Sequence, residues 1–189
     1  MTDPERRPSA RQEELLESAY RYVLDHGLTD MSLRPLAAAI GSSPRVLLFL
    51  FGSKDGLTRA LLARARADEL ALLERVGLPS DALGLAGAVR ATWSWLADPQ
   101  HRQLLVLWVQ AYARSLTEPS GPSADFARAT VEDWLTILGA AQTPSRRRTR
   151  AGLAERTLAL VVLRGALLDL LATGDLPRTT AAVERHLEG

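Results

Sequence analysis

The sequence predicts an all-α protein with a small N-terminal head of three helices and a larger helical domain behind it. Apolar residues recur at helical spacing along nearly the whole chain, and no segment shows sustained strand-type alternation or an Asn-Gly hairpin turn. Glycine and proline punctuate the chain at residues 98–99, 118–123, 143–144 and 174–177. The 189 residues are enough to bury a substantial core.

The first helix is expected over Arg11–Asp25. Ser9 and Gln12 have the spacing of a capping box at its start, and Gly27 ends it. The residues expected to face inward lie at helical spacing and are Leu15, Ala19, Tyr22 and Val23.

The most informative part of the chain is residues 32–57, whose sequence is SLRPLAAAIGSSPRVLLFLFGSKDGL. Ala37, Gly41 and Leu47 have the spacing of a helix-turn-helix: a small residue permits a close crossing, a glycine makes the turn, and a leucine packs the second helix onto the first. The other inward positions are filled by Leu36, Ile40 and Leu50. This motif presents its second helix to the major groove of DNA, so it indicates function as well as fold.

Capping residues set the bounds of these helices. Ser32 is expected to cap the second helix, and Ser43 the third, with Pro44 at its favoured first position. Gly52 ends the third helix, and the fourth is expected over Lys54–Val76.

Five further helical segments follow, and their expected bounds are Asp81–Ala97, Pro99–Leu116, Ala124–Ala141, Arg146–Thr173 and Pro177–Glu188. Within them, Arg164 and Asp169 interrupt the apolar run Leu158–Ala172. Such a run is expected of a helix that is buried on more than one side.

Composition excludes several classes of protein. The chain has no cysteine, so disulfides, thiolate metal sites and cysteine nucleophiles are excluded. The longest apolar stretches are far shorter than a membrane span, and the N-terminus has no signal-peptide core, so we expect a soluble cytoplasmic protein. The histidines match no metal-ligand spacing, and no catalytic constellation or phosphate loop is present, so we expect neither an enzyme, nor a metal site, nor a cofactor.

The distribution of charge is more informative than the net charge of +1. Residues 1–30 contain four arginines and seven acidic residues, whereas residues 31–66 contain six basic residues and Asp55 alone as an acid. A basic segment over a helix-turn-helix is typical of DNA binding, although a solvated charged face would look the same.

The run FGSKDGL at Phe51–Leu57, directly behind the helix-turn-helix, resembles the motif that ends the recognition helix in the tetracycline-repressor (TetR/AcrR) family. The resemblance implies a DNA-binding domain over residues 1–54 and a helical ligand-binding and dimerisation domain over residues 55–189. It further implies a homodimer that binds a palindromic operator on double-stranded DNA and is a repressor released by a small effector.

Eight residues are expected at the DNA interface: Ser32, Arg34, Ser43, Pro44, Arg45, Leu48, Phe49 and Lys54. Lys54, at a helix start, is expected to reach a phosphate. Arg45 is a candidate for reading guanine, with a phosphate contact nearly as plausible, and Ser32 is either a backbone contact or only a cap. Leu48 stands where the family usually has a phosphate-bonding tyrosine. Base reading must therefore use Arg45, Ser43 and apolar contacts of Leu48 or Phe49 with thymine methyl groups.

Six of the ten aromatic residues fall within Trp93–Trp134, as is typical of a pocket for an organic ligand, although an ordinary core would serve equally well for any one of them. Trp93 and Trp95 lie about 200° apart around a helix, so both cannot face one cavity. The residues expected to bind the effector are Trp93, Trp108, Tyr112, Trp134 and Arg164. The dimer is expected to form through Asp125–Ala141 and Glu155–Thr173.

A second functional hypothesis follows from the apolar recognition helix. The chain could be a helical small-molecule-binding or adaptor protein whose head no longer reads DNA. Salt-dependent binding to duplex DNA separates the two hypotheses.

Overall fold

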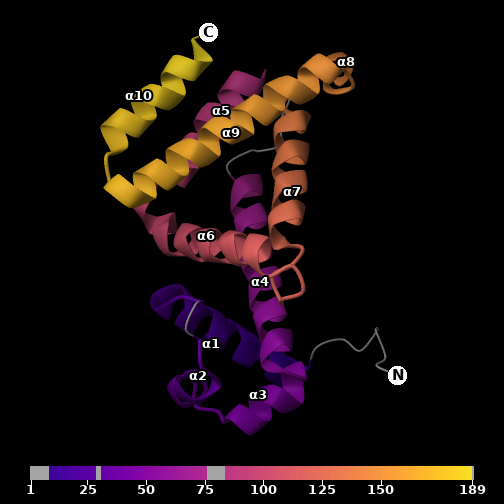
Figure 1. Ribbon diagram of the computed structural model, residues 1–189, viewed down its shortest axis with the longest axis vertical. Coiled ribbons are helices and arrows are strands. Elements are labelled where there is room, and N and C mark those ends of the chain that lie inside the picture. The colour runs from indigo at the N-terminus through magenta and orange to yellow at the C-terminus, as the bar shows by residue number, and fades with distance from the viewer. Residues whose placement is uncertain (1–8, 29–30, 76–83, 189) are drawn as a thin grey trace. The chain divides into compact units, whose positions relative to one another are not determined.

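The computed structural model describes residues 9–28, 31–75 and 84–188, with side chains for all of these except residues 72–75. The described residues are helical almost throughout and contain no strand, which confirms the predicted all-α class (Figure 1). The helices divide into two compact units, one of residues 1–66 and 107–126 and the other of residues 67–106 and 127–189.

The first unit contains α1 (Ala10–His26), α2 (Leu33–Ala39) and α3 (Pro44–Phe51), the first part of α4 (Lys54–Arg75) and most of α6 (Arg102–Thr117). Ser9 caps α1 by accepting from the backbone N–H of Gln12, as predicted. The core of the first unit is built from leucines of α1 to α4, with small residues between them. The largest fully buried side chains in this unit include Leu15, Leu36, Leu47, Leu57 and Leu61.

The inward face of α1 differs from the prediction at one aromatic residue. Tyr20 is buried, at 3% exposure, together with Leu15, Ala19 and Val23. Tyr22 instead is half-buried and stacks on His26, with their ring centroids 4.0 Å apart. Tyr20 also lies under the guanidinium of Arg64 in α4, 4.9 Å from its ring centroid, and this contact favours its inward position.

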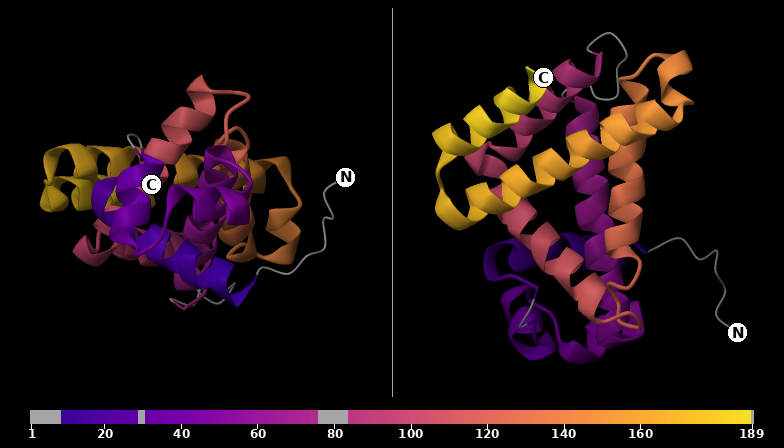
Figure 2. Two further views of the ribbon diagram at one scale, coloured as in Figure 1. Left: turned by 90° about the horizontal axis from the view of Figure 1, so that it is seen from below. Right: turned by 45° about the horizontal axis from the view of Figure 1, so that its top comes forward.

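The second unit contains the rest of α4, then α5 (Gly84–Leu96), the short 3-10 turn Pro99–His101, the start of α6, α7 (Phe126–Ala140), α8 (Pro144–Arg147), α9 (Arg150–Thr173) and α10 (Leu176–Leu187). The last helix, α10, packs on both α9 and α5 (Figure 2). Val183 of α10 and Leu163 of α9 are almost fully buried in this unit.

The segment predicted as one helix over Arg146–Thr173 is two helices in the structure. Thr143 caps α8, and Thr149 then caps α9 by accepting from the N–H of Gly152. A Cβ on Gly152 would lie 2.1 Å from the carbonyl oxygen of Arg146, so the close junction of the two helices requires glycine there. Similarly, the expected helix Pro99–Leu116 begins with a 3-10 turn.

Other expected bounds agree to within a few residues, and the expected ends at Val76 and Asp81 lie outside the described residues. In the part of the chain that is described, no single helix is both long and apolar enough to cross a membrane. The pair Leu33–Ala39 and Pro44–Phe51, bent by 102°, meets that criterion only when its two helices are taken together.

Candidate nucleic-acid interface and effector site

The helix-turn-helix is formed by α2 and α3. Ala37 and Leu47 are buried, at 0% and 1% exposure, and Gly41 makes the turn with a φ of 64°. The left-handed conformation of Gly41 favours glycine, because other residues lose stability there. The three residues on which the motif was predicted therefore have the expected packing and backbone geometry.

The recognition helix α3 is fixed at both ends. Ser43 accepts from the backbone N–H of Val46 at 3.3 Å, and Pro44 occupies the first turn. At the other end, the side-chain amide of Gln12 in α1 donates to the carbonyl oxygen of Leu50 at 3.1 Å. These contacts hold the helix on the head and leave its other face exposed.

That outward face carries one cation and several apolar side chains. Arg45 is exposed, and the exposed fractions of Leu48 and Phe49 are 40% and 85%. Residues three and four apart are neighbours on a helix, so these three side chains form one surface. A phenylalanine that is 85% exposed stabilises no core in this unit, which points to a binding role for this surface.

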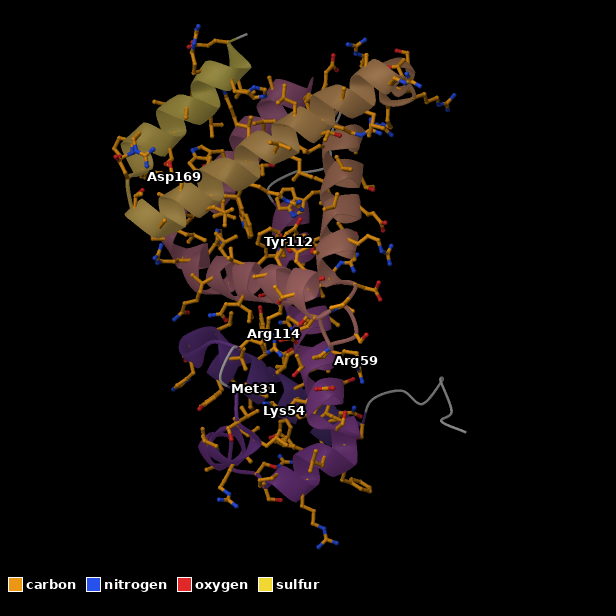
Figure 3. All side chains as sticks on the ribbon, viewed as in Figure 1. Met31, Lys54, Arg59, Tyr112, Arg114 and Asp169 are labelled. Carbon is orange, nitrogen blue, oxygen red and sulfur yellow. The ribbon has the colours of Figure 1, made fainter. Side chains whose placement is uncertain are left out.

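Lys54 is the first residue of α4 and is exposed (Figure 3). Ser53 accepts from the backbone N–H of Gly56 at 2.9 Å, so it caps the same helix start. The amino group of Lys54 and the positive end of the helix dipole therefore belong to one local site that suits an anion such as a phosphate.

Sequence reasoning did not single out Gly56, which the junction of α3 and α4 requires. A Cβ at this position would lie 2.0 Å from the carbonyl oxygen of Phe51. The second glycine of FGSKDGL thus allows the end of α3 to approach the start of α4. The steric demand became visible only once the path of the backbone was known.

Ser32 and Arg34 lie at the start of α2, and both are exposed. Ser32 occupies the N-cap position, but its side chain makes no capping hydrogen bond, contrary to the expected cap. The hydroxyl of Ser32 therefore does not cap α2. Its contact with the DNA backbone stays a prediction.

The five residues expected to bind the effector lie in different settings. Trp108 stacks on Tyr112, with ring centroids 5.0 Å apart, in the unit that also contains the head. Trp93 donates to the hydroxyl of Thr180 at 2.9 Å, and Arg164 is half-buried in α9. The role of each in binding an effector stays a prediction.

Trp134 of α7 is the fifth of these residues and lies beside a buried carboxylate. Its indole N–H donates to Glu69 of α4 at 3.1 Å, and the exposed fractions of both residues are 5%. Because Glu69 is a charged residue type in an interior position, its hydrogen bond to Trp134 is part of what makes its burial tolerable.

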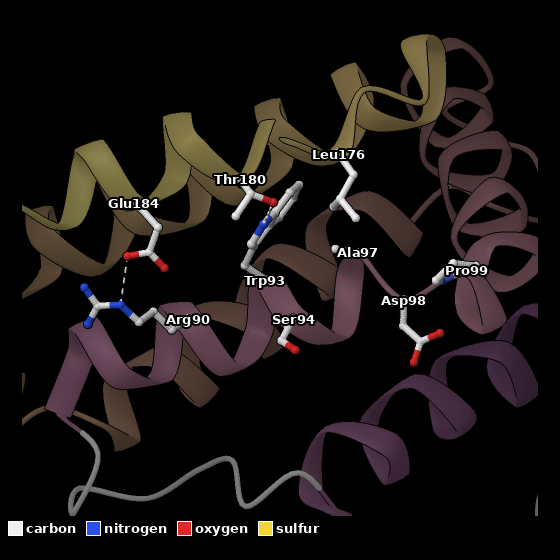
Figure 4. Close-up of a pocket in the computed structure, with 9 residues that line it drawn as sticks. All are labelled: Arg90, Trp93, Ser94, Ala97, Asp98, Pro99, Leu176, Thr180 and Glu184. Atoms are coloured by element: carbon white, nitrogen blue, oxygen red, sulfur yellow. Dashed lines mark hydrogen bonds and ion pairs between the residues drawn. The ribbon is translucent and has the colours of Figure 1, made fainter. Parts of the chain in front are cut away.

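Two surface grooves lie within the second unit. One, of about 500 Å³, runs between α5 and α10, with Trp93, Leu176 and the ion pair of Arg90 with Glu184 along it (Figure 4). The other, of about 440 Å³, is lined by α7, α8 and α9 and includes Arg147 and Arg156. Within residues 9–28, 31–75 and 84–188, no group of three histidine, aspartate or glutamate side chains could hold a metal ion.

Two exposed ion pairs stabilise the ends of α9. The guanidinium of Arg146 lowers the pKa of Glu155 near its start, chiefly through a direct hydrogen bond. Arg178 in α10 likewise lowers the pKa of Asp169 near the end of α9, with a contact of 2.6 Å. Both pairs connect α9 to a neighbouring helix and therefore contribute to its position in the unit.

Comparisons with known proteins agree with this architecture. No family model matches the chain. It is 29% identical to the HTH-type transcriptional repressor Rv1474c of Mycobacterium tuberculosis over 182 residues, which cover 93% of this chain and 89% of that protein.

Solved structures extend the similarity to the fold. A TetR transcription regulator from Haloarcula marismortui has a TM-score of 0.72 at 19% identity and covers 94% of this chain and 95% of its own. The multidrug binding protein EbrR, complexed with proflavin, has a TM-score of 0.66 at 24% identity and covers 94% of this chain and 99% of its own. The resemblance identified in residues 51–57 is therefore confirmed at the level of the whole described chain, which has the fold of the TetR family of transcriptional regulators.

Proposed function

We propose that the chain is a ligand-responsive transcriptional repressor that binds double-stranded DNA as a homodimer. The observation that carries this proposal is the outward face of α3, where Arg45, Leu48 and Phe49 are exposed on a helix held by its opposite side. A regulator of this kind acts on the chromosome, so the proposal includes a cytoplasmic location.

The proposed division of roles on DNA follows from side-chain chemistry. Lys54, Arg34 and Ser32 contact phosphates and set the position of the head, because their groups lie at helix starts and carry positive charge or a hydroxyl. Arg45 contacts guanine, the base that offers two acceptors to a guanidinium in the major groove. Ser43 and Pro44, at the start of α3, border the same surface.

The proposed homodimer is supported by a stripe of exposed residues along α9. Leu158, Val161 and Leu168 are 52%, 61% and 50% exposed, and they recur at intervals of three and seven residues. Gly165 lies between them, and a Cβ added there would meet no atom within 4 Å. An unpartnered apolar stripe with a small residue at its centre suits close packing against the same helix of a second copy.

The other helix expected in the dimer, α7, has a more polar outer face than α9. Its outer face includes Arg128 and Glu132, whose side chains are exposed and form an ion pair at 3.0 Å. The proposal therefore places the dimer contact chiefly on α9, within the expected range Glu155–Thr173, and leaves Asp125–Ala141 as a prediction.

The effector is proposed to be a small organic molecule that binds in the helical domain and releases DNA. EbrR, a protein of the same fold, was crystallised with proflavin and also with imidazole. The concentration of buried tryptophans in α5, α6 and α7 supports an organic ligand for this chain too.

The alternative, a ligand-binding or adaptor protein that does not read DNA, is favoured by one observation. Arg45 is the only charged residue in α3, so the face that would read bases is mostly apolar. Such a helix makes few hydrogen bonds to base edges, which are the usual source of specificity.

Selection of bound duplexes from a random DNA pool by the purified protein separates the two functions. Recovery of a palindrome whose half-sites are one helical turn or a multiple apart would support the dimeric repressor. No enrichment at low salt, from protein shown to be folded and dimeric, would favour the adaptor.

A further inference from the structure

Two buried polar groups on α5 have no hydrogen-bond partner among the described residues. They are the hydroxyl of Thr92 and the indole N–H of Trp95, and the exposed fractions of these residues are 0% and 4%. Buried polar groups in proteins are nearly always paired, because an unpaired group has lost water without compensation. Two such groups one helical turn apart therefore need a physical explanation.

The two groups lie on one face of α5. Thr92 and Trp95 are three residues apart, about 60° around the helix, and Ala88, one turn before Thr92, shares this face with a small side chain. Trp93 lies about 200° around the helix from Trp95, on nearly the opposite side. Its indole N–H donates to Thr180 of α10, as Figure 4 shows, so the face that meets α10 is a different one.

The indole of Trp95 is held in place by contacts that do not use its N–H group. Its ring stacks on His101, with centroids 4.5 Å apart and planes 24° apart. The Nδ1 atom of His101 also lies 2.8 Å from the carbonyl oxygen of Trp95. A donor that is fixed before a ligand arrives loses little entropy on binding, which is the usual property of a binding-site residue.

Two other indoles have an acceptor within the protein. Trp93 donates to Thr180 and Trp134 donates to Glu69. The expectation that Trp93 and Trp95 face different sides is consistent with this arrangement, and of the two tryptophans of α5 it is Trp95 whose donor has no partner among the described residues.

We infer that Thr92 and Trp95 form the polar anchor of the effector site and bind the carbonyl oxygen of an uncharged organic molecule. An indole N–H can only donate, so the ligand must offer an acceptor, and the threonine hydroxyl can donate to the same oxygen. Neither residue is charged, so neither supplies a counter-charge to an ionised ligand group, and both suit a neutral acceptor. The inference rests on the proposed function, because it assumes an effector.

Two conservative variants remove the polar groups of the anchor while keeping an apolar side chain at each position. Thr92→Val replaces the hydroxyl by a methyl group, and Trp95→Phe removes the N–H while keeping an aromatic ring against His101. The matched control, Thr180→Val, breaks a hydrogen bond that is satisfied within the protein and lies at a residue with no proposed role in binding the effector.

The probes are acetophenone and ethylbenzene, which have the same ring and similar size but differ by a carbonyl oxygen. The chain has four tryptophans, so a ¹⁵N-labelled sample gives four indole N–H signals, which the Trp→Phe variants assign. We expect acetophenone, and not ethylbenzene, to move the indole proton of Trp95 downfield. We also expect acetophenone to bind at least fivefold more weakly to the Thr92 and Trp95 variants than to the Thr180→Val control.

A second measurement needs no ligand. Thr92→Val is expected to raise the midpoint of thermal unfolding, because it removes an unpaired group, whereas Thr180→Val is expected to lower it. The inference would be overturned if Thr92→Val lowered the midpoint as Thr180→Val does, or if acetophenone left the Trp95 signal unchanged. If acetophenone does not bind at Thr92 and Trp95, the selection of a palindromic duplex can still succeed. If the selection fails while acetophenone binds at these residues, only the proposal of a DNA-binding repressor is contradicted.

Discussion

Arg45 is the single charged side chain on the recognition helix, so sequence preference is expected to depend chiefly on it. Arg45→Ala is expected to reduce the preference for the selected duplex over a duplex with one changed guanine by about 1–3 kcal/mol. Affinity for unrelated duplexes should change little. Binding titrations on both duplexes measure this. Arg148→Ala, which removes the same charge from the other compact unit, is the control, and an equal loss in both variants would contradict the assignment.

Phe49 allows a test of apolar base reading. If its ring contacts a thymine methyl group, replacing that thymine by deoxyuridine should weaken wild-type binding by about 0.8 kcal/mol for each methyl, or about fourfold. The same replacement should have no effect on Phe49→Ala, because that variant has already lost the contact. A deoxyuridine effect of the same size in both proteins would show that the methyl is read by another residue.

The junction of α3 and α4 depends on a glycine without a side chain. Gly56→Ala would place a Cβ 2.0 Å from the carbonyl oxygen of Phe51, so the helix ends must separate. We expect the free energy of unfolding to fall by about 1–3 kcal/mol, with a loss of DNA affinity as α3 moves. Gly139→Ala is the control, since its Cβ would lie 3.5 Å from the nearest atom. Denaturant unfolding checks the prediction, and equal stability of the two variants would contradict it.

The connection between α9 and α10 should be sensitive to acid. Arg178 lowers the pKa of Asp169, so the carboxylate stabilises the fold above the unfolded-state pKa of about 3.9. That contribution is lost as the pH falls through the lower pKa of the folded state. Wild type should therefore unfold at a higher temperature than Asp169→Asn near neutral pH, with the gap closing below about pH 4. A gap that is constant from pH 7 to pH 3 would show that the ion pair is not its source.

Across the chain, helical periodicity and capping residues were sufficient to predict the fold and the position of the recognition helix. Ser43, Gly41 and Leu47 each encode a local requirement that the sequence shows directly. The break between α8 and α9 was missed, because it depends on the approach of the Arg146 carbonyl to Gly152, a contact between backbones. The burial of Tyr20 in place of Tyr22 is also not evident from the period of α1 alone, and the contact of Tyr20 with Arg64 joins two helices.

The sequence predicts the DNA-binding surface of the first unit more completely than the arrangement of the tryptophans. The residues around α3 are contiguous in sequence, so their shared surface followed from the motif. The indole groups come from several helices, and periodicity could state that Trp93 and Trp95 diverge but not which one meets α10. The hydrogen bond from Trp93 to Thr180 joins residues 87 positions apart, which no local pattern encodes.

In the proposed complex, two copies of this head bind the phosphates and bases of one DNA site. Titrating salt on the selected duplex and on a scrambled one, with wild type and Lys54→Ala, tests this proposal. If Arg34 and Lys54 each neutralise one phosphate per protomer, the slope of log affinity against log salt is about −4 for wild type and about −2 for the variant. Wild type should also bind the selected duplex more tightly at every salt concentration. A flat salt dependence with equal affinity for both duplexes would contradict the proposal, and an unchanged slope in Lys54→Ala would remove Lys54 from the phosphate contacts.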